Sequence, residues 1–138
     1  MTASEVSPAR AVATRAELVE LWLAALAALR RQRGGGALAR DLAAGRSDRA
    51  WLDEAIARAN LWYLDDAAIA LVDASTILGV YVVPEQRRHG LARTLVAALR
   101  EARPSLGDAL VLPGDRATKS LYESLGWRAR LLTMAEPS

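Results

Sequence analysis

The sequence has no cysteine and a single histidine, His89. The absence of cysteine excludes disulfides, thiolate metal sites and cysteine nucleophiles. A Ser-His-Asp triad or a histidine-ligated metal would depend on His89 alone, so we predict neither, and no metal cofactor. Positive and negative side chains nearly balance, with a net charge of +2. A dedicated nucleic-acid-binding protein would be expected to carry a larger positive charge.

Long apolar runs are also missing. The most apolar stretch, Leu18–Leu29, has 12 residues and contains Glu20, so it is too short to cross a bilayer. The segment Met1–Ala13 lacks the basic and then apolar layout of a signal peptide. We therefore expect no membrane association and a cytoplasmic location. With 138 residues, 52% of them hydrophobic, we expect a single domain over residues 1–138 with one core.

Hydrophobic spacing predicts helices in the first part of the chain and strands in the middle. Thr14 and Glu17 form a capping box, which predicts a helix from Arg15. Ser47 is the expected N-cap of a later helix. The other predicted helices cover Ala37–Ala44, Asp48–Ala59, Leu91–Arg103 and Arg116–Leu125, and the predicted strands cover Ala11–Ala13, Leu61–Leu64, Ala68–Val72, Ile77–Val83, Ala109–Leu112 and Trp127–Met134.

With residues 37–59 counted as one helical region, the order of these elements is (β)ααβββαβαβ, with the three middle strands as an antiparallel meander. Such an order indicates an α/β or α+β fold with a mixed sheet. No Gly-x-Gly-x-x-Gly follows a strand, so the pattern is not that of a Rossmann fold.

The most informative segment lies between the third meander strand and the helix that follows it. The strand stops at Pro84, and a basic loop, Arg87–Gly90, then opens into the helix at Leu91. Main-chain N–H groups at the start of a helix have no partner inside it, and the helix dipole adds positive charge there. This arrangement predicts an anion site, to which Arg87, Arg88 and Arg93 add mobile charge. The alternative is a solvated basic turn without a ligand.

This segment resembles the acetyl-coenzyme A loop of the GNAT superfamily of N-acetyltransferases. The family pattern is Arg/Gln-x-x-Gly-x-Gly/Ala, and Arg87-Arg88-His89-Gly90-Leu91-Ala92 matches each fixed position. A second segment, Asp115–Trp127, is similar to the family's Asn-x-x-Ala-x-x-Leu-Tyr-x-x-x-Gly-Phe, with Leu121, Tyr122 and Gly126 in agreement. Asp115 and Thr118 replace the usual asparagine and alanine, and Arg88 stands where many relatives have glycine.

The resemblance implies a GNAT-like, mixed and mostly antiparallel twisted sheet, flanked by about four helices. The strands over residues 77–83 and 109–112 would splay apart, and the pantetheine arm of acetyl-coenzyme A would lie between them. The N–H group of Val82 or Val83 would polarise the thioester, and Tyr122 would act as the general acid. The implied cofactor-binding residues are Tyr81, Val82, Val83, Arg87, Arg88, His89, Gly90, Leu91, Ala92, Arg93, Asp115 and Lys119.

The general base and the acceptor are not identified by the sequence. Asp65, Asp66, Asp73 or a chain of water molecules could take the proton. The acceptor is expected to be the primary amine of a small molecule or peptide, and a second subunit could close its site. Two rival hypotheses are an acyl-coenzyme A-binding regulatory module without activity, and a helix-turn-helix DNA-binding protein over residues 37–59, whose second helix carries too many carboxylates to favour DNA.

Overall fold

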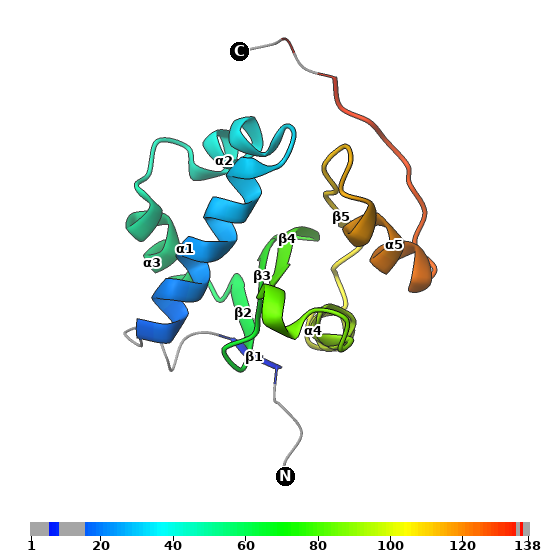
Figure 1. Cartoon of the computed structure of the whole chain (residues 1–138), viewed down its shortest axis with the longest axis horizontal. Coiled ribbons are helices and arrows are strands. Elements are labelled where there is room, and N and C mark those ends of the chain that lie inside the picture. The colour runs from blue at the N-terminus through cyan, green and yellow to red at the C-terminus, as the bar shows by residue number, and fades with distance from the viewer. Residues whose placement is uncertain (1–5, 9–15, 135, 137–138) are drawn as a thin grey trace.

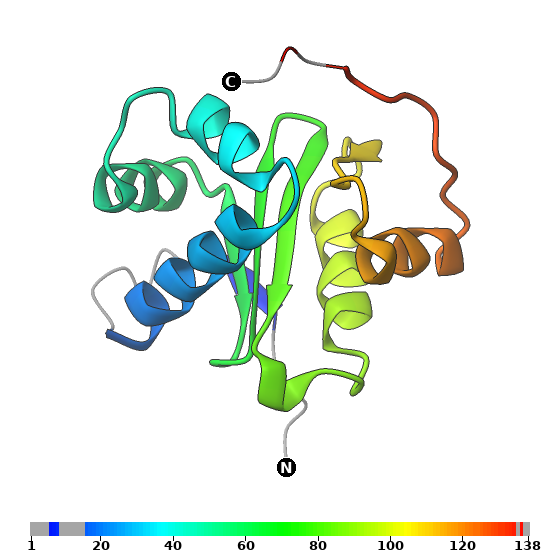
Figure 2. The same cartoon turned by 45° about the horizontal axis from the view of Figure 1, so that its top comes forward.

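Two groups of helices cover opposite faces of a five-stranded sheet (Figure 1). The computed structural model describes residues 6–8, 16–134 and 136. The view in Figure 2 separates α1, α2 and α3 on one face from α4 and α5 on the other. The helices are α1 (Ala16–Arg31), α2 (Gly35–Ala43), α3 (Asp48–Ala57), α4 (Leu91–Ala102) and α5 (Arg116–Ser124), with a short 3-10 helix η2 (Pro84–Gln86); the strands are β1 (Val6–Pro8), β2 (Leu61–Leu64), β3 (Ala68–Asp73), β4 (Thr76–Val82) and β5 (Asp108–Ala109).

The N-terminal helices form one half of the core. The indole rings of Trp22 in α1 and Trp51 in α3 meet edge to face, with their centroids 5.0 Å apart. The predicted N-cap of α3 is confirmed, because the Ser47 hydroxyl accepts a hydrogen bond from the Ala50 N–H at 3.1 Å. The two predicted segments of the helical region over residues 37–59 form separate helices, α2 and α3, so the described residues contain five α-helices, where the resemblance implied about four. The predicted strand Ala11–Ala13 and the capping residue Thr14 lie outside the described residues.

The structure gives α3 a role in the core. Its residues Trp51, Leu52, Ala55 and Ile56 are buried against α1 and the sheet. Its carboxylates are paired with arginines: Asp48 with Arg30 at 2.7 Å, and Glu54 with Arg46 and Arg58. A recognition helix must present a free face to DNA. The burial and ion pairing of α3 therefore argue against the helix-turn-helix hypothesis.

The turn between α1 and α2 requires glycine at one position. A Cβ atom added to Gly35 would lie 1.7 Å from the Leu29 carbonyl oxygen, whereas a Cβ on Gly36 would meet nothing within 4 Å. We expect Gly35→Ala to lower the free energy of unfolding by about 2 kcal/mol, because the two helices must move apart. Gly36→Ala is the matched control and should raise it by about 0.5 kcal/mol. Urea denaturation measures both, and equal effects would contradict the close approach.

The meander has nearly the predicted boundaries. Strand β2 pairs antiparallel with β3, β3 pairs antiparallel with β4, and β1 adds to the outer edge of β2. Side chains along β2 alternate between faces: Leu61 and Tyr63 pack towards α1, and Trp62 and Leu64 pack towards α4. The register shifts at Leu78, where β4 carries one extra residue and forms a β-bulge.

The predicted last strand, Trp127–Met134, is wrong. Residues 127–134 have no regular secondary structure, and Leu131, Leu132 and Met134 are 80%, 81% and 88% exposed. Figure 1 shows this segment running away from the sheet. A strand requires a neighbour for its N–H and C=O groups, and apolar composition alone does not supply one. Within the described residues, the polar contact that ties this segment to β5 is Arg130 with Asp108 at 3.3 Å.

The helices that the structure describes are also limited in length and hydrophobicity. None of them could cross a membrane.

Candidate active site

Strands β4 and β5 pair at one end and then separate. Their parallel ladder contains Thr76↔Asp108 and Ile77↔Ala109, and it ends with the Leu110 N–H donating to the Ile77 carbonyl at 3.0 Å. Only Ala109 of the predicted strand Ala109–Leu112 is in this ladder, which begins one residue earlier than predicted. Beyond it β4 continues to Val82 without β5 beside it. The predicted splay between residues 77–83 and 109–112 is therefore confirmed.

The open edge of β4 offers main-chain hydrogen-bonding groups. The Val83 N–H is already used, since it donates to the Ala67 carbonyl at 2.8 Å on the β3 side. Successive residues of a strand direct these groups to opposite edges, so Val82 and Val80 direct theirs into the gap beside β5. Arg87 Nε confirms this direction, because it donates to the Val82 carbonyl at 3.0 Å. Of the two predicted thioester donors, Val83 is thus occupied and Val82 is open.

Val80 was missed by the sequence analysis. It lies two residues before Val82 on the same edge, and it lines the apolar cleft described below. Strand periodicity could have identified it, because counting back by two from an open N–H gives the next open N–H.

The basic loop ends in a helix start with unpaired main-chain donors. The first helical hydrogen bond of α4 runs from the Thr94 N–H to the Gly90 carbonyl at 3.0 Å. None of the described hydrogen bonds is donated by the main chain of residues 88–93. Gly90 has a left-handed φ of 75°, and Arg88 has one of 69°. A residue with a side chain is strained in that conformation, and glycine is not, so Arg88 is held there at a cost in backbone energy.

Some of the basic side chains around this helix start contact other parts of the protein, and others are exposed. Arg87 turns back onto β4, with its guanidinium 5.8 Å from the centre of the Tyr81 ring. Arg93 donates to the Ser124 hydroxyl at 2.9 Å and so links α4 to α5. Arg88 and His89 are exposed, and no described side chain pairs with them. The predicted Lys119 lies on α5 in an ion pair with Glu123 at 2.9 Å.

Tyr122 places a hydroxyl group in the interior beside the splayed strands. Its side chain is 4% exposed, stacks on Trp127 at 5.2 Å between ring centroids, and belongs to the cluster that includes Val80 and Val82. The hydroxyl is buried and has no hydrogen-bond partner among the described residues. Burial, and then the nearby Asp115 carboxylate, raise the pKa of Tyr122 well above its ordinary value. The phenol is therefore protonated at neutral pH.

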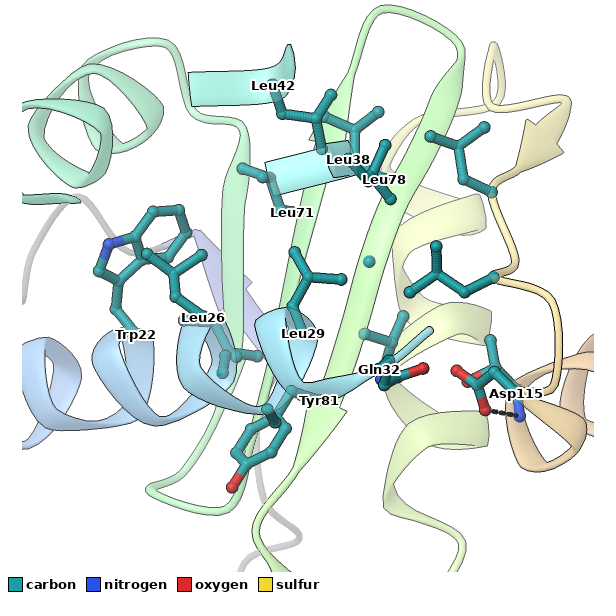
Figure 3. Close-up of a pocket in the computed structure, with 18 of the residues that line it drawn as sticks. Trp22, Leu26, Leu29, Gln32, Leu38, Leu42, Leu71, Leu78, Tyr81 and Asp115 are labelled. Atoms are coloured by element: carbon teal, nitrogen blue, oxygen red, sulfur yellow. Dashed lines mark hydrogen bonds between the residues drawn. The ribbon is translucent and has the colours of Figure 1, made fainter. Parts of the chain in front are cut away.

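An apolar cleft opens between α1, α2, the edge of β4 and the segment that runs from β5 to α5 (Figure 3). It is open to solvent, and a water-sized group has about 100 Å³ of space in it. Its apolar walls include Trp22, Leu26, Leu29, Leu42, Leu71 and Leu78.

One end of the apolar cleft is polar. Figure 3 shows Gln32, just after α1, and Asp115, at the start of α5, facing each other there. Asp115 caps α5: its carboxylate accepts from the Thr118 N–H at 3.1 Å and from the Thr118 hydroxyl at 2.7 Å. Asp65, Asp66 and Asp73, the carboxylates predicted as possible bases, do not line this cleft.

Comparison with known proteins agrees with this geometry. The sequence matches the acetyltransferase (GNAT) domain over residues 46–129. Among curated proteins there is no match. Solved structures with a similar fold include the aminoglycoside N-acetyltransferase AAC(6')-Iy in complex with CoA, which is 20% identical with a TM-score of 0.51 over 74% of this chain and 84% of that chain. A GNAT-family protein from Xanthomonas campestris pv. campestris also aligns with this chain, at 20% identity and a TM-score of 0.46, over 99% of this chain and 95% of that chain.

The domain match spans more than half of the chain, and it includes β4, the basic loop, α4 and α5. This chain therefore belongs to the GNAT acetyltransferase family.

Proposed function

We propose that this protein is an N-acetyltransferase, which moves the acetyl group of acetyl-coenzyme A to a primary amine. Acetyl-coenzyme A is the acetyl donor of the family. The observation that carries the proposal is the presence of two stretches of open main-chain donors. One lies at the start of α4, and the other lies along the free edge of β4, at Val82 and Val80, beside the apolar cleft.

The residues of these two stretches suit coenzyme A. Its pyrophosphate is an anion, and the unpaired N–H groups of residues 88–93 at a helix start are suited to bind one. Arg88 is exposed, and no described residue pairs with it, so its guanidinium is available to the phosphates. The pantetheine arm has amide groups that can pair with the edge of β4 as an added strand would. We assign Arg87–Arg93, Val80 and Val82 to cofactor binding.

The cofactor supplies an acetyl thioester that a neutral amine can attack. The Val80 N–H lies where the β4–β5 gap meets the apolar cleft, and we assign it, with Val82, to polarising the thioester carbonyl. Tyr122 lies on the other face of the sheet and holds a proton at neutral pH. We assign it as the general acid that protonates the departing sulfur, whose reference pKa is about 8.5.

Water is proposed to accept the proton that the attacking amine must lose. The three turn carboxylates that were considered from the sequence do not line the apolar cleft. An amine with a pKa near 10 is mostly protonated at neutral pH. We therefore expect the rate to rise with pH between about 7 and 9, as the neutral amine becomes more abundant.

Two measurements test the proposal. Calorimetric titration with coenzyme A should show binding at one site per chain. Acetyl-coenzyme A with a panel of primary amines should then release free thiol, followed with a thiol-reactive dye. Absence of binding would refute the proposal. Binding without thiol release from any amine would favour the regulatory module, which holds the cofactor without using it.

A further inference from the structure

The apolar cleft continues past the gap between β4 and β5 into the core. Its outer walls, Val80 on one side and Leu110 and Leu112 on the other, are the two sides of that gap, where the pantetheine arm is proposed to lie. Resting on the proposed acyl transfer, we infer that the inner part of the cleft binds the acyl chain of the thioester, and that the preferred donor carries an apolar chain longer than acetyl. Gly79 is the residue that admits this chain.

The inner part of the cleft is bounded by residues of the hydrophobic core. They come from α1, α3, β2 and β3, none of which forms the gap, and each is at most 4% exposed: Trp22, Leu26, Trp51, Leu61 and Ile69. Protein interiors are close-packed, and space left unfilled between apolar side chains costs stability. Water gains little from such a space, because it finds few hydrogen-bond partners there. The inner part of the cleft is therefore suited to a hydrocarbon chain.

The gap places the thioester next to this inner part. The arm is proposed to enter from the start of α4, which follows the Val82 end of β4, and the gap closes at the other end, where Ile77 pairs with Ala109. An arm that lies along the edge of β4 therefore directs its thioester towards the closed end. Val80 and then Gly79 lie in that direction, and both line the cleft. The acyl group beyond the thioester carbonyl lies beside Gly79.

Gly79 leaves the passage from the gap to the inner part open. It pairs with Leu71 of β3, and directly paired residues point to the same face of a sheet, here the face that α1, α2 and α3 cover (Figure 2). A Cβ atom added to Gly79 would meet nothing within 4 Å, so there is room in front of this residue. Its φ is not left-handed, so the backbone does not require glycine here. The missing side chain therefore provides space for a ligand.

The charge of the cleft excludes a polar chain of the same length. Among the described residues that line it, Asp115 is the one with a charged side chain, and arginine and lysine are absent. A succinyl group would bring a second carboxylate to apolar walls, where it would lose water and gain no cation. A straight alkanoyl chain loses no such hydration, and each added CH₂ group gains from burial. The preferred donor is thus an alkanoyl-coenzyme A.

The longer chain leaves the transfer step unchanged. The neutral amine forms the new C–N bond with the acyl carbon, the C–S bond breaks, and Tyr122 gives its proton to the sulfur, while water takes the proton that the nitrogen loses. The chain beyond the acyl carbon takes no part in these bonds. Its effect is on binding of the donor, so a binding measurement tests the inference and requires no acceptor.

The test compares coenzyme A, acetyl-coenzyme A, butanoyl-coenzyme A and succinyl-coenzyme A by calorimetric titration. Wild-type protein should bind butanoyl-coenzyme A about tenfold more tightly than acetyl-coenzyme A, because two more CH₂ groups are buried. Succinyl-coenzyme A should bind no more tightly than acetyl-coenzyme A. In Gly79→Val the acetyl and butanoyl donors should bind equally well, because the new side chain occupies the passage. Valine suits a strand, so the variant should fold.

The matched control is Gly107→Val. Gly107 precedes β5, is exposed, lies outside the cleft lining and also has no left-handed φ. This variant should keep the tenfold preference for the butanoyl donor. The inference is overturned if wild-type protein binds acetyl-coenzyme A as tightly as butanoyl-coenzyme A, if the succinyl donor matches the butanoyl donor, or if Gly79→Val keeps the preference.

The ranking of the donors on wild-type protein requires no variant. Coenzyme A, which has no acyl chain, reports on the arm and the pyrophosphate alone. If it does not bind, the error lies in the proposed function. If it binds and the donors rank in another order, the error lies in the acyl-chain inference.

Discussion

Gly90→Glu should weaken coenzyme A binding by about 100-fold. Gly90 is the residue before α4, and it has open space around it: a Cβ added there meets nothing within 4 Å. The new carboxylate would stand where the proposed pyrophosphate binds. Two like charges about 4 Å apart near a protein surface repel by up to about 4 kcal/mol, and a loss of about 2.7 kcal/mol corresponds to 100-fold in affinity. Calorimetric titration with coenzyme A measures the change.

Gly45→Glu is the control for this variant. Gly45 has a φ of 83°, similar to the 75° of Gly90, and it also has nothing within 4 Å of an added Cβ. It lies between α2 and α3, on the other side of the sheet from α4 (Figure 2). Both variants should lose about 1 kcal/mol of stability through backbone strain. If Gly45→Glu weakens coenzyme A binding as much as Gly90→Glu does, the helix start is not the phosphate site.

The parts of the fold that the sequence predicts well are those with a local cause. Strand Leu61–Leu64 has the predicted boundaries, since each of its residues faces one of two apolar layers. Helix α3 begins after Ser47 as predicted, because a capping hydroxyl acts over three residues. Both features depend on neighbours in the sequence, so periodicity and capping chemistry suffice to find them.

The parts that were wrong or missed depend on distant partners. The apolar composition of Trp127–Met134 is suitable for a strand, but pairing requires an adjacent edge that the sequence does not reveal. Val83 has the sequence context of a cofactor donor, yet its N–H is bonded to Ala67, sixteen positions earlier in the chain. The apolar cleft was not predicted, because its walls come from α1, α2, β3, β4 and the segment from β5 to α5 together. Gln32 faces Asp115 only through this packing.

Tyr122→Phe should lower the turnover rate by about 100-fold at pH 7, with little change in the affinity for coenzyme A. General acids contribute roughly 10²–10⁴ to a rate, and a thiolate with a reference pKa of about 8.5 needs less help than a poorer leaving group. The deficit should therefore become smaller as the pH rises above about 8.5. A pH–rate profile of both proteins measures it. A constant deficit at all pH values would argue that Tyr122 positions the cofactor and donates no proton.

The same substitution should make the protein more stable, in contrast to its effect on activity. The Tyr122 hydroxyl is buried without a described partner, so its removal should raise the free energy of unfolding by about 1 kcal/mol. The pKa of Tyr122 is raised in the folded state, so above the unfolded value of about 10 the folded protein binds more protons than the unfolded one. Wild-type stability should then fall as the pH rises through 10, and the variant should lack this component of the loss.

Tyr63→Phe provides the matched control, since Tyr63 is a half-buried tyrosine of β2 that packs on the α1 side. It removes the same atom from a residue outside the proposed site and should leave the turnover rate and its pH dependence unchanged. A general acid kept protonated by burial must leave a polar group without a partner until substrate arrives, which costs stability. If Tyr122→Phe lowers the turnover rate and raises the free energy of unfolding, while Tyr63→Phe changes neither, the lost stability is due to the hydroxyl group that catalysis requires. If Tyr122→Phe were less stable than wild type, the hydroxyl would have a structural partner and the acid would have to be sought elsewhere.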